Sequence, residues 1–145
     1  MNTPDKTKQL RSSVKLLNNK LLFSGSVYGN EPIMIDYIPP HGDGAGYTSL
    51  ELLLLSLTSC LGSAVLTLLR RTNKEILNCE IDAEGYRRLS HPMGFESIEI
   101  GIKIQSNDVT DADMQKVLKL SEETLCPVWA MLKGNVKIDV KYTIE

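Results

Sequence analysis

The stretch Thr48–Arg71, TSLELLLLSLTSCLGSAVLTLLRR, is the long apolar segment that decides the fold. It carries no charge from Leu52 to Leu69, a length at which a single membrane span is one hypothesis. Hydroxyl side chains interrupt it at five positions: Ser56, Thr58, Ser59, Ser63 and Thr67. These interruptions favour a buried helix of a soluble domain, with the rest of the chain packed around it.

Small polar side chains recur along this helix at steps of three and four. They are Ser56, Cys60, Ser63 and Thr67, and the spacing places them in one stripe with Cys60 near its middle. One interpretation is that the Cys60 thiol lies where another group can approach it closely. The other is a cysteine acting as a small buried hydrophobe while small neighbours let another helix pack tightly. This stretch alone leaves both interpretations open.

The ends of the helix have sequence signals. Thr48 and Glu51 form a capping-box pattern, in which the Thr48 hydroxyl accepts from the Glu51 amide and the carboxylate reaches back. Arg70 and Arg71 suit a helix C-terminus, and Asn73 can stop the helix. We therefore expect a helix that begins near Thr48 and ends near Arg71.

Length and composition predict one globular domain. The chain has 145 residues and a formal net charge of −2, which gives no attraction to nucleic acid. Its three cysteines have neither zinc-site spacing nor the even count of a disulfide framework, which indicates intracellular thiols. The polar start lacks a signal core, so we expect a cytoplasmic protein with disordered residues 1–12 and a single domain over 13–145. A very apolar helix in so small a chain also predicts a homodimer.

The segment before the helix reads as three strands. Residues 14–17 and 20–29 alternate as strands, joined by a two-residue turn at Asn18-Asn19. A third strand is expected at 32–37. The Pro- and Gly-rich residues 39–47 then form an irregular loop.

The segment after the helix reads as two strands, two helices and a strand. Residues 77–84 and 98–104 alternate as two strands, which we expect to pair antiparallel, with Cys79 pointing inward. An amphipathic helix over 110–125 opens with Thr110 and Asp113 as its capping pair. A short helix begins after the bend at Cys126-Pro127 and ends at Gly134, and a strand over 136–144 closes the chain.

The resulting order is β-β-β-α-β-β-α-α-β. Runs of strands separated by helices predict an α+β fold, with antiparallel sheets packed around the long buried central helix.

Two cysteines, Cys60 and Cys126, are candidates for redox chemistry. At a helix N-terminus the unpaired amides would favour the Cys126 thiolate and lower its pKa, although a cysteine can also stand there as a simple cap. Cys60 lies mid-helix, where burial alone would raise its pKa. Together they could act as an attacking and a resolving thiol.

The chain resembles the OsmC/Ohr family of thiol-dependent hydroperoxide reductases over residues 14–144. Three segments carry the resemblance: LELLLLSLTSCLGSAV, FESIEIGI and ETLCPVWAMLKGNVKIDV. The resemblance implies that Cys60 is the peroxidatic cysteine, that Cys126 resolves its sulfenic acid, and that Cys79 has no family role. It further implies an intertwined homodimer with two sites at the subunit interface. No cofactor or metal would be bound, and a dihydrolipoyl-type dithiol would be the external reductant.

The family's activating arginine and glutamate are not at their usual positions, which hold Pro40 and Leu50. The sequence has no arginine between Arg11 and Arg70, so activation would come from Lys20, His41 or an arginine of a partner chain.

Glu51 is a supporting candidate, shifted by one residue from the family position. Nine residues of ideal helix would turn it to the side opposite Cys60 and about 13 Å away, so a capping role competes with a catalytic one.

The two histidines, His41 and His91, lie in loops without a second ligand at a metal-binding spacing. The preferred hypothesis is therefore a peroxidase acting on organic hydroperoxides, with an antioxidant role in oxidative stress. The alternative is a slow redox sensor or small-molecule-binding relative, and the third hypothesis is the single-span membrane protein.

Overall fold

The computed structural model describes residues 5–145, so residues 1–4 of the predicted disordered start lie outside the described part. By its internal contacts the chain divides into two compact units, one ending at Leu52 and the other spanning Leu53–Glu145. The single domain over 13–145 stays a prediction.

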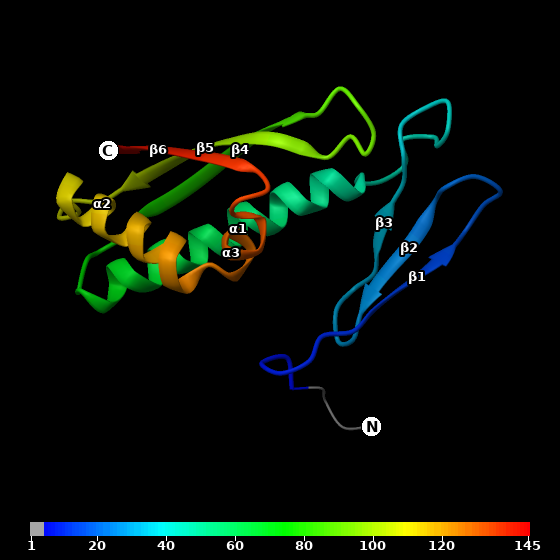
Figure 1. The fold of residues 1–145 in the computed structure, drawn as a ribbon. Coiled ribbons are helices and arrows are strands. Elements are labelled where there is room, and N and C mark those ends of the chain that lie inside the picture. The colour runs from blue at the N-terminus through cyan, green and yellow to red at the C-terminus, as the bar shows by residue number, and fades with distance from the viewer. Residues whose placement is uncertain (1–4) are drawn as a thin grey trace. The chain divides into compact units, whose positions relative to one another are not determined.

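The first unit contains an antiparallel sheet in the order β1-β2-β3 (Figure 1). Its strands are β1 (Ser12–Leu16), β2 (Phe23–Val27) and β3 (Ile33–Ile35), which confirms the three predicted strands. The prediction of a two-residue turn at Asn18-Asn19 is wrong, because neither residue has the positive φ that such a turn requires. The Asn18 side chain instead accepts from the Lys20 and Leu22 amides at 3.0 and 3.1 Å, which holds a longer connection.

A buried carboxylate organises the loop that follows β3. Asp36 is 3% exposed, and its side chain accepts from the backbone amides of Tyr37, Asp43 and Ala45 at 2.7, 3.2 and 3.0 Å. The bond from Ala45 is the main reason that the pKa of Asp36 lies below its ordinary value. A side chain at Gly42 would collide with the Tyr37 carbonyl and with this carboxylate. The loop is therefore tied to one carboxylate in one conformation.

We expect Asp36→Asn to lower the thermal midpoint at pH 7, because an amide cannot accept three bonds as a carboxylate does. The folded state depresses the pKa of Asp36, so this stabilisation is present above the unfolded value and fades as pH falls below about 3.9. Thermal melts at pH 7 and pH 3 measure the effect, which should shrink at pH 3. The control is Asp43→Asn at an exposed ion pair, where little change is expected. Equal melting of the two variants at pH 7 would count against this role.

Helix α1 (Ser49–Arg71) has the predicted ends. The Thr48 hydroxyl accepts from the Glu51 amide at 3.2 Å, and the Glu51 carboxylate accepts from the Thr48 amide at 2.9 Å. Beyond Arg71, Asn73 adopts the left-handed conformation with φ 60° and stops the helix. The capping box and the stop signal are both confirmed.

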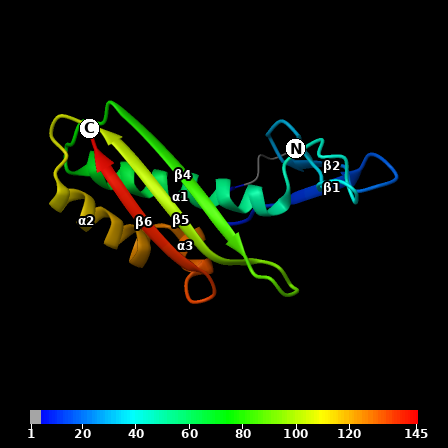
Figure 2. The same ribbon diagram turned by 90° about the horizontal axis from the view of Figure 1, so that it is seen from above.

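The second unit contains the rest of α1, a three-stranded sheet in the order β4-β5-β6, and three short helical segments. The strands are β4 (Asn78–Arg87), β5 (Phe95–Gln105) and β6 (Lys137–Ile144). The helical segments are α2 (Asp111–Leu120), the π-helical turn η1 (Ser121–Leu125) and α3 (Pro127–Leu132). Figures 1 and 2 show α1, α2 and α3 on the same face of this sheet.

The sheet is mixed, not antiparallel throughout. Strands β4 and β5 pair antiparallel as predicted, but β6 runs parallel to β5 (Figure 2). In this pairing Ile98 lies opposite Ile138. The reason is the connection: α2 and η1 carry the chain back along the sheet, so β6 begins beside the start of β5. Helical connections of this kind join parallel strands, which the sequence interpretation overlooked.

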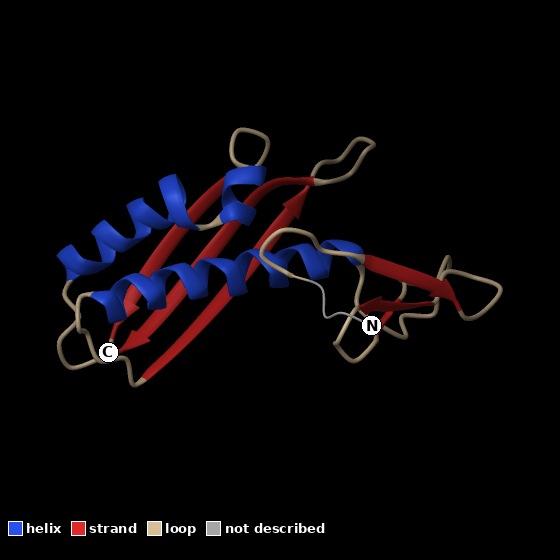
Figure 3. Ribbon diagram, turned by 90° about the horizontal axis from the view of Figure 1, so that it is seen from below, coloured by secondary structure: helices blue, strands red, loops and turns tan. Residues whose placement is uncertain are grey.

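The core of the second unit lies between its sheet and its helices (Figure 3). It is built from the isoleucines of β5, one face of α1 and the inner side of α2; the most buried members are Ile98, Ile102, Ile104, Leu57, Leu61, Val65, Leu69 and Met114. Gly62 lets α1 approach β4 closely, since a Cβ there would lie 2.9 Å from the Ile81 side chain.

Only one face of α1 is buried within the single chain, and cover of the other face by a partner chain stays a prediction. The exposed side includes Leu55, at 51% exposure. The helix is long and apolar enough to cross a membrane. Its buried stripe against β4 is nevertheless what a core helix requires.

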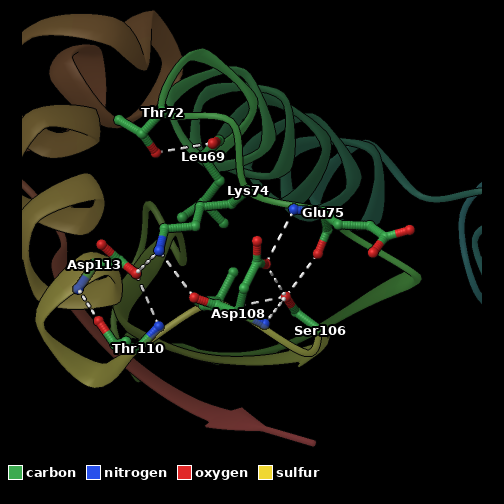
Figure 4. Close-up of polar contacts among 9 residues, drawn as sticks. Leu69, Thr72, Lys74, Glu75, Ser106, Asp108, Thr110 and Asp113 are labelled. Atoms are coloured by element: carbon green, nitrogen blue, oxygen red, sulfur yellow. Dashed lines mark hydrogen bonds and ion pairs between the residues drawn. The ribbon is translucent and has the colours of Figure 1, made fainter.

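A polar network joins the α1–β4 and β5–α2 connections (Figure 4). The buried Ser106 hydroxyl donates to the Glu75 carbonyl at 2.6 Å, and the Glu75 amide donates to Asp108 at 3.1 Å. Lys74 donates to the Asp108 carbonyl at 2.9 Å and pairs with Asp113 at 3.3 Å. Two connections distant in sequence are thereby fixed to each other, next to the predicted and confirmed capping box of α2.

Candidate active site

Cys60 lies on α1 at the border between its buried and exposed faces. It is a free, half-buried thiol, next to fully buried Leu61. Two exposed serines nearby bond to the helix itself: the Ser59 hydroxyl donates to the Ser56 carbonyl at 3.2 Å, and the hydroxyl of Ser63, a member of the stripe, donates to the Ser59 carbonyl at 2.9 Å. Cys60 is the one thiol of the stripe.

Cys126 caps α3 from the bend between η1 and α3. Its backbone is extended, with φ −93° and ψ 98°, and Pro127 occupies the first turn of the helix, as predicted. Its carbonyl accepts from the Ala130 amide at 3.0 Å. The side chain is a free thiol and only 2% of the residue is exposed.

The two thiols are neighbours within the second unit. Burial raises the pKa of Cys126 to about 11, the Trp129 and Val128 amides oppose this rise, and the adjacent Cys60 thiol adds to it. The predicted lowering of the Cys126 pKa by the start of α3 is thus present, but burial exceeds it. The two free thiols, on α1 and at the Cys-Pro bend, are 66 positions apart in sequence but close enough for Cys60 to influence the pKa of Cys126.

We expect Cys126 to react with iodoacetamide at pH 8 about two orders of magnitude more slowly than an ordinary thiol. With its pKa raised to about 11, only a small fraction is thiolate at that pH, and the rate should climb as pH approaches 11. Mass spectrometry of timed samples measures this rate. Denatured protein is the control, in which Cys126 should react at the ordinary rate. Rapid labelling of folded protein at pH 8 would contradict the buried, protonated thiol.

Cys79 is not part of this pair. It lies half-buried on β4, where burial raises the pKa of its thiol and the nearby Arg70 lowers it. Arg70, the first arginine that follows Arg11 in the sequence, thus acts on Cys79.

The supporting candidates lie in the first unit. The Glu51 carboxylate is engaged by the Thr48 amide, which lowers its pKa, so its capping role is shown while a catalytic role stays a prediction. Lys20 is paired with Asp43 at 2.7 Å. The His41 ring lies 6.2 Å from that of Tyr37, centroid to centroid. Within residues 5–145 no group of three metal-ligating side chains converges.

The sequence interpretation missed η1, because it read residues 110–125 as one regular helix. The Cys126 amide bonds to the carbonyl of Ser121, five residues earlier, at 2.9 Å. No feature of residues 121–125 distinguishes a π-turn from an α-turn in sequence, since such a turn depends on one surplus residue, not on composition.

Residues 42–141 match the family model of the OsmC-like proteins, and the chain belongs to that family. The resemblance drawn from the three sequence segments is therefore confirmed. Protein YhfA of Escherichia coli K12 is 27% identical over 124 residues, which cover 86% of this chain and 90% of YhfA.

Solved structures agree with the fold. A hypothetical protein from Aquifex aeolicus VF5 is similar with a TM-score of 0.83 and 26% identity, over 95% of this chain and 97% of its own. An organic hydroperoxide resistance protein from Elizabethkingia anophelis has a TM-score of 0.76 and 14% identity, over 100% of both chains. The second likeness concerns the fold alone.

Proposed function

We propose that this protein is a thiol-dependent peroxidase that reduces organic hydroperoxides, with Cys60 as the peroxidatic and Cys126 as the resolving cysteine. The observation that carries the proposal is the meeting of these two free thiols between α1 and α3. Membership of a family whose structural relatives include organic hydroperoxide resistance proteins supports it.

The chemistry requires only two thiols and an external dithiol. The Cys60 thiolate attacks one peroxide oxygen, the O–O bond breaks, and the alkoxide leaves as an alcohol after taking a proton. The Cys126 sulfur then displaces hydroxide from the Cys60 sulfenic acid; its own proton leaves with that hydroxide as water, and a disulfide forms. A dithiol of dihydrolipoyl type reduces this disulfide through a mixed disulfide and is itself oxidised. No bound cofactor or metal enters these steps.

The apolar composition of α1 around Cys60 favours peroxides with alkyl or aryl groups over hydrogen peroxide. We also propose a cytoplasmic location, because three free cysteines are typical of proteins in a reducing compartment. Nucleic acid and membrane are not among the partners that we propose.

A second copy of the chain is the partner that we propose, with the active sites at the subunit interface. Large apolar side chains of the first unit are exposed in the single chain, among them Val14 at 61%, Leu16 at 50% and Ile38 at 55%. A small sheet with such side chains needs cover. The exposed face of α1 needs cover for the same reason.

The test is to mix reduced protein with cumene hydroperoxide and map the thiols by mass spectrometry. A Cys60–Cys126 disulfide is expected, and a Cys79→Ser variant should form it equally well. Unreacted Cys60, or a sulfenic acid that never condenses with Cys126, would contradict the proposal.

A second candidate is a slow redox sensor with the same two thiols. It is favoured by the absence of arginine between Arg11 and Arg70, since the thiolate would then lack its usual cation. Turnover separates the two functions: a rate with peroxide and dithiol no faster than that of a free thiol would support the sensor.

A further inference from the structure

The resolving cysteine follows a turn that contains one residue more than an α-helix allows. In η1 the Cys126 amide bonds to the Ser121 carbonyl, a spacing of five residues in place of four. The preceding helix α2 is regular, and the Ser121 hydroxyl is tied to its last turn by a bond of 2.7 Å to the Val117 carbonyl.

The extra residue decides which side chain faces the interior. An α-helix turns by about 100° per residue, so five residues would place Cys126 about 140° around the axis from Ser121. Leu125 would then take the inner position. In the structure, Ser121 is fully buried and Cys126 is 2% exposed, whereas Leu125 is half-buried. The π-turn therefore places Cys126 on the inner side. In a regular α-helix, Leu125 would lie there.

The neighbouring contacts hold this arrangement from both sides. Pro127 keeps Cys126 out of the helical region, so the π-turn ends at this residue. Across the bend, Glu122 pairs with Lys133 beyond the end of α3 at 3.3 Å. Glu123, on the outer side of the turn, is exposed.

We propose that the π-turn Ser121–Leu125 absorbs one surplus residue and thereby keeps Cys126 on the inner side, toward Cys60. This inference rests on the proposed function, for which it names the positioning element. The position of the resolving thiol then tolerates the loss of the surplus residue but not the addition of a second one, and it does not depend on the side chain at Glu123.

Deletion and insertion at the same point give opposite expectations. Deleting Glu123 converts the turn to α-spacing, with the Cys126 amide four residues from Ser121, so Cys126 still faces inward. Inserting an alanine between Glu123 and Thr124 adds a second surplus residue and rotates Cys126 away. In an ordinary helix both changes would rotate it, by about 100° in opposite directions. Glu123→Ala is the matched control, which keeps the residue count.

Disulfide formation is measured with diamide, an azo oxidant that takes two electrons and two protons from a dithiol, and by equilibration with dithiothreitol. We expect the Glu123 deletion and Glu123→Ala to form the Cys60–Cys126 disulfide within about threefold of the original rate. The insertion should slow it about a hundredfold or more and lower the effective concentration of the two thiols correspondingly, while Cys60 still reacts once with peroxide. Loss of disulfide formation in a folded deletion variant, or full retention in the insertion variant, overturns the inference.

The unaltered protein gives an independent measurement if a variant fails to fold. A through-hydrogen-bond NMR coupling is expected between the Cys126 nitrogen and the Ser121 carbonyl carbon, and a coupling to the Glu122 carbonyl in its place overturns the π-turn. Because diamide needs no peroxide chemistry, the two proposals fail separately. Disulfide formation with diamide but not with hydroperoxide would contradict the peroxidase proposal and would support the inference about the position of Cys126.

Discussion

Cys60→Ser should abolish the dithiol-dependent reduction of cumene hydroperoxide, with a loss of about a thousandfold or more. A serine hydroxyl at this position cannot accept the peroxide oxygen as a thiolate does when it becomes a sulfenic acid. Cys79 cannot replace Cys60, because it does not interact with Cys126. Peroxide consumption in the presence of dihydrolipoamide measures the loss.

Cys126→Ser should separate the two halves of the reaction. Cys60 should still consume about one equivalent of peroxide per chain and give a sulfenic acid that dimedone traps, while repeated turnover falls. Cys79→Ser is the control and should keep the full rate, since Cys79 is influenced by Arg70 and not by the pair. Retained turnover in Cys60→Ser, or equal losses in all three variants, would contradict the role of Cys60 as the peroxidatic cysteine.

Trp129→Ala should destabilise the fold by about 3–5 kcal/mol, the usual cost of removing a large buried aromatic side chain. Trp129 is the only tryptophan of the chain and is 6% exposed on α3, a helix of six residues. So short a helix depends on packing for its stability. Urea unfolding followed by circular dichroism measures the change.

The matched control is Met131→Ala on the same helix. Met131 is 74% exposed, so its removal should change the free energy of unfolding by less than about 0.5 kcal/mol. Since α3 also carries the amides that face Cys126, Trp129→Ala should slow formation of the Cys60–Cys126 disulfide even where the protein remains folded. Similar stabilities of the two variants would show that α3 is not anchored by its tryptophan.

Side-chain periodicity was sufficient to predict most of the elements. The alternation of Ile98, Ile100, Ile102 and Ile104 predicted β5, and the Thr48–Glu51 pair predicted the start of α1, because burial and capping act on neighbouring residues. Both cysteines of the site were identified as candidates from local position and from the family resemblance.

Features that depend on distant parts of the chain were not accessible in this way. Alternation in residues 136–144 gives the faces of β6 but not its direction, which the helical connection sets. The cap position of Cys126 predicted a lowered pKa, whereas the surrounding fold buries the thiol and raises it. The turn at Asn18 was misjudged because its side chain, and not a positive φ, closes the connection.

The parallel pairing of β5 and β6 also orders events during folding. Strands β4 and β5 meet through a short hairpin, but each β5 residue meets its β6 partner forty positions later, as Ile98 meets Ile138. Closing the longer loop costs more chain entropy, so the hairpin forms early and the third strand docks late. The segment that carries Cys126 lies inside that loop. We therefore expect the Cys126 side chain to reach its place near Cys60 only when β6 has docked.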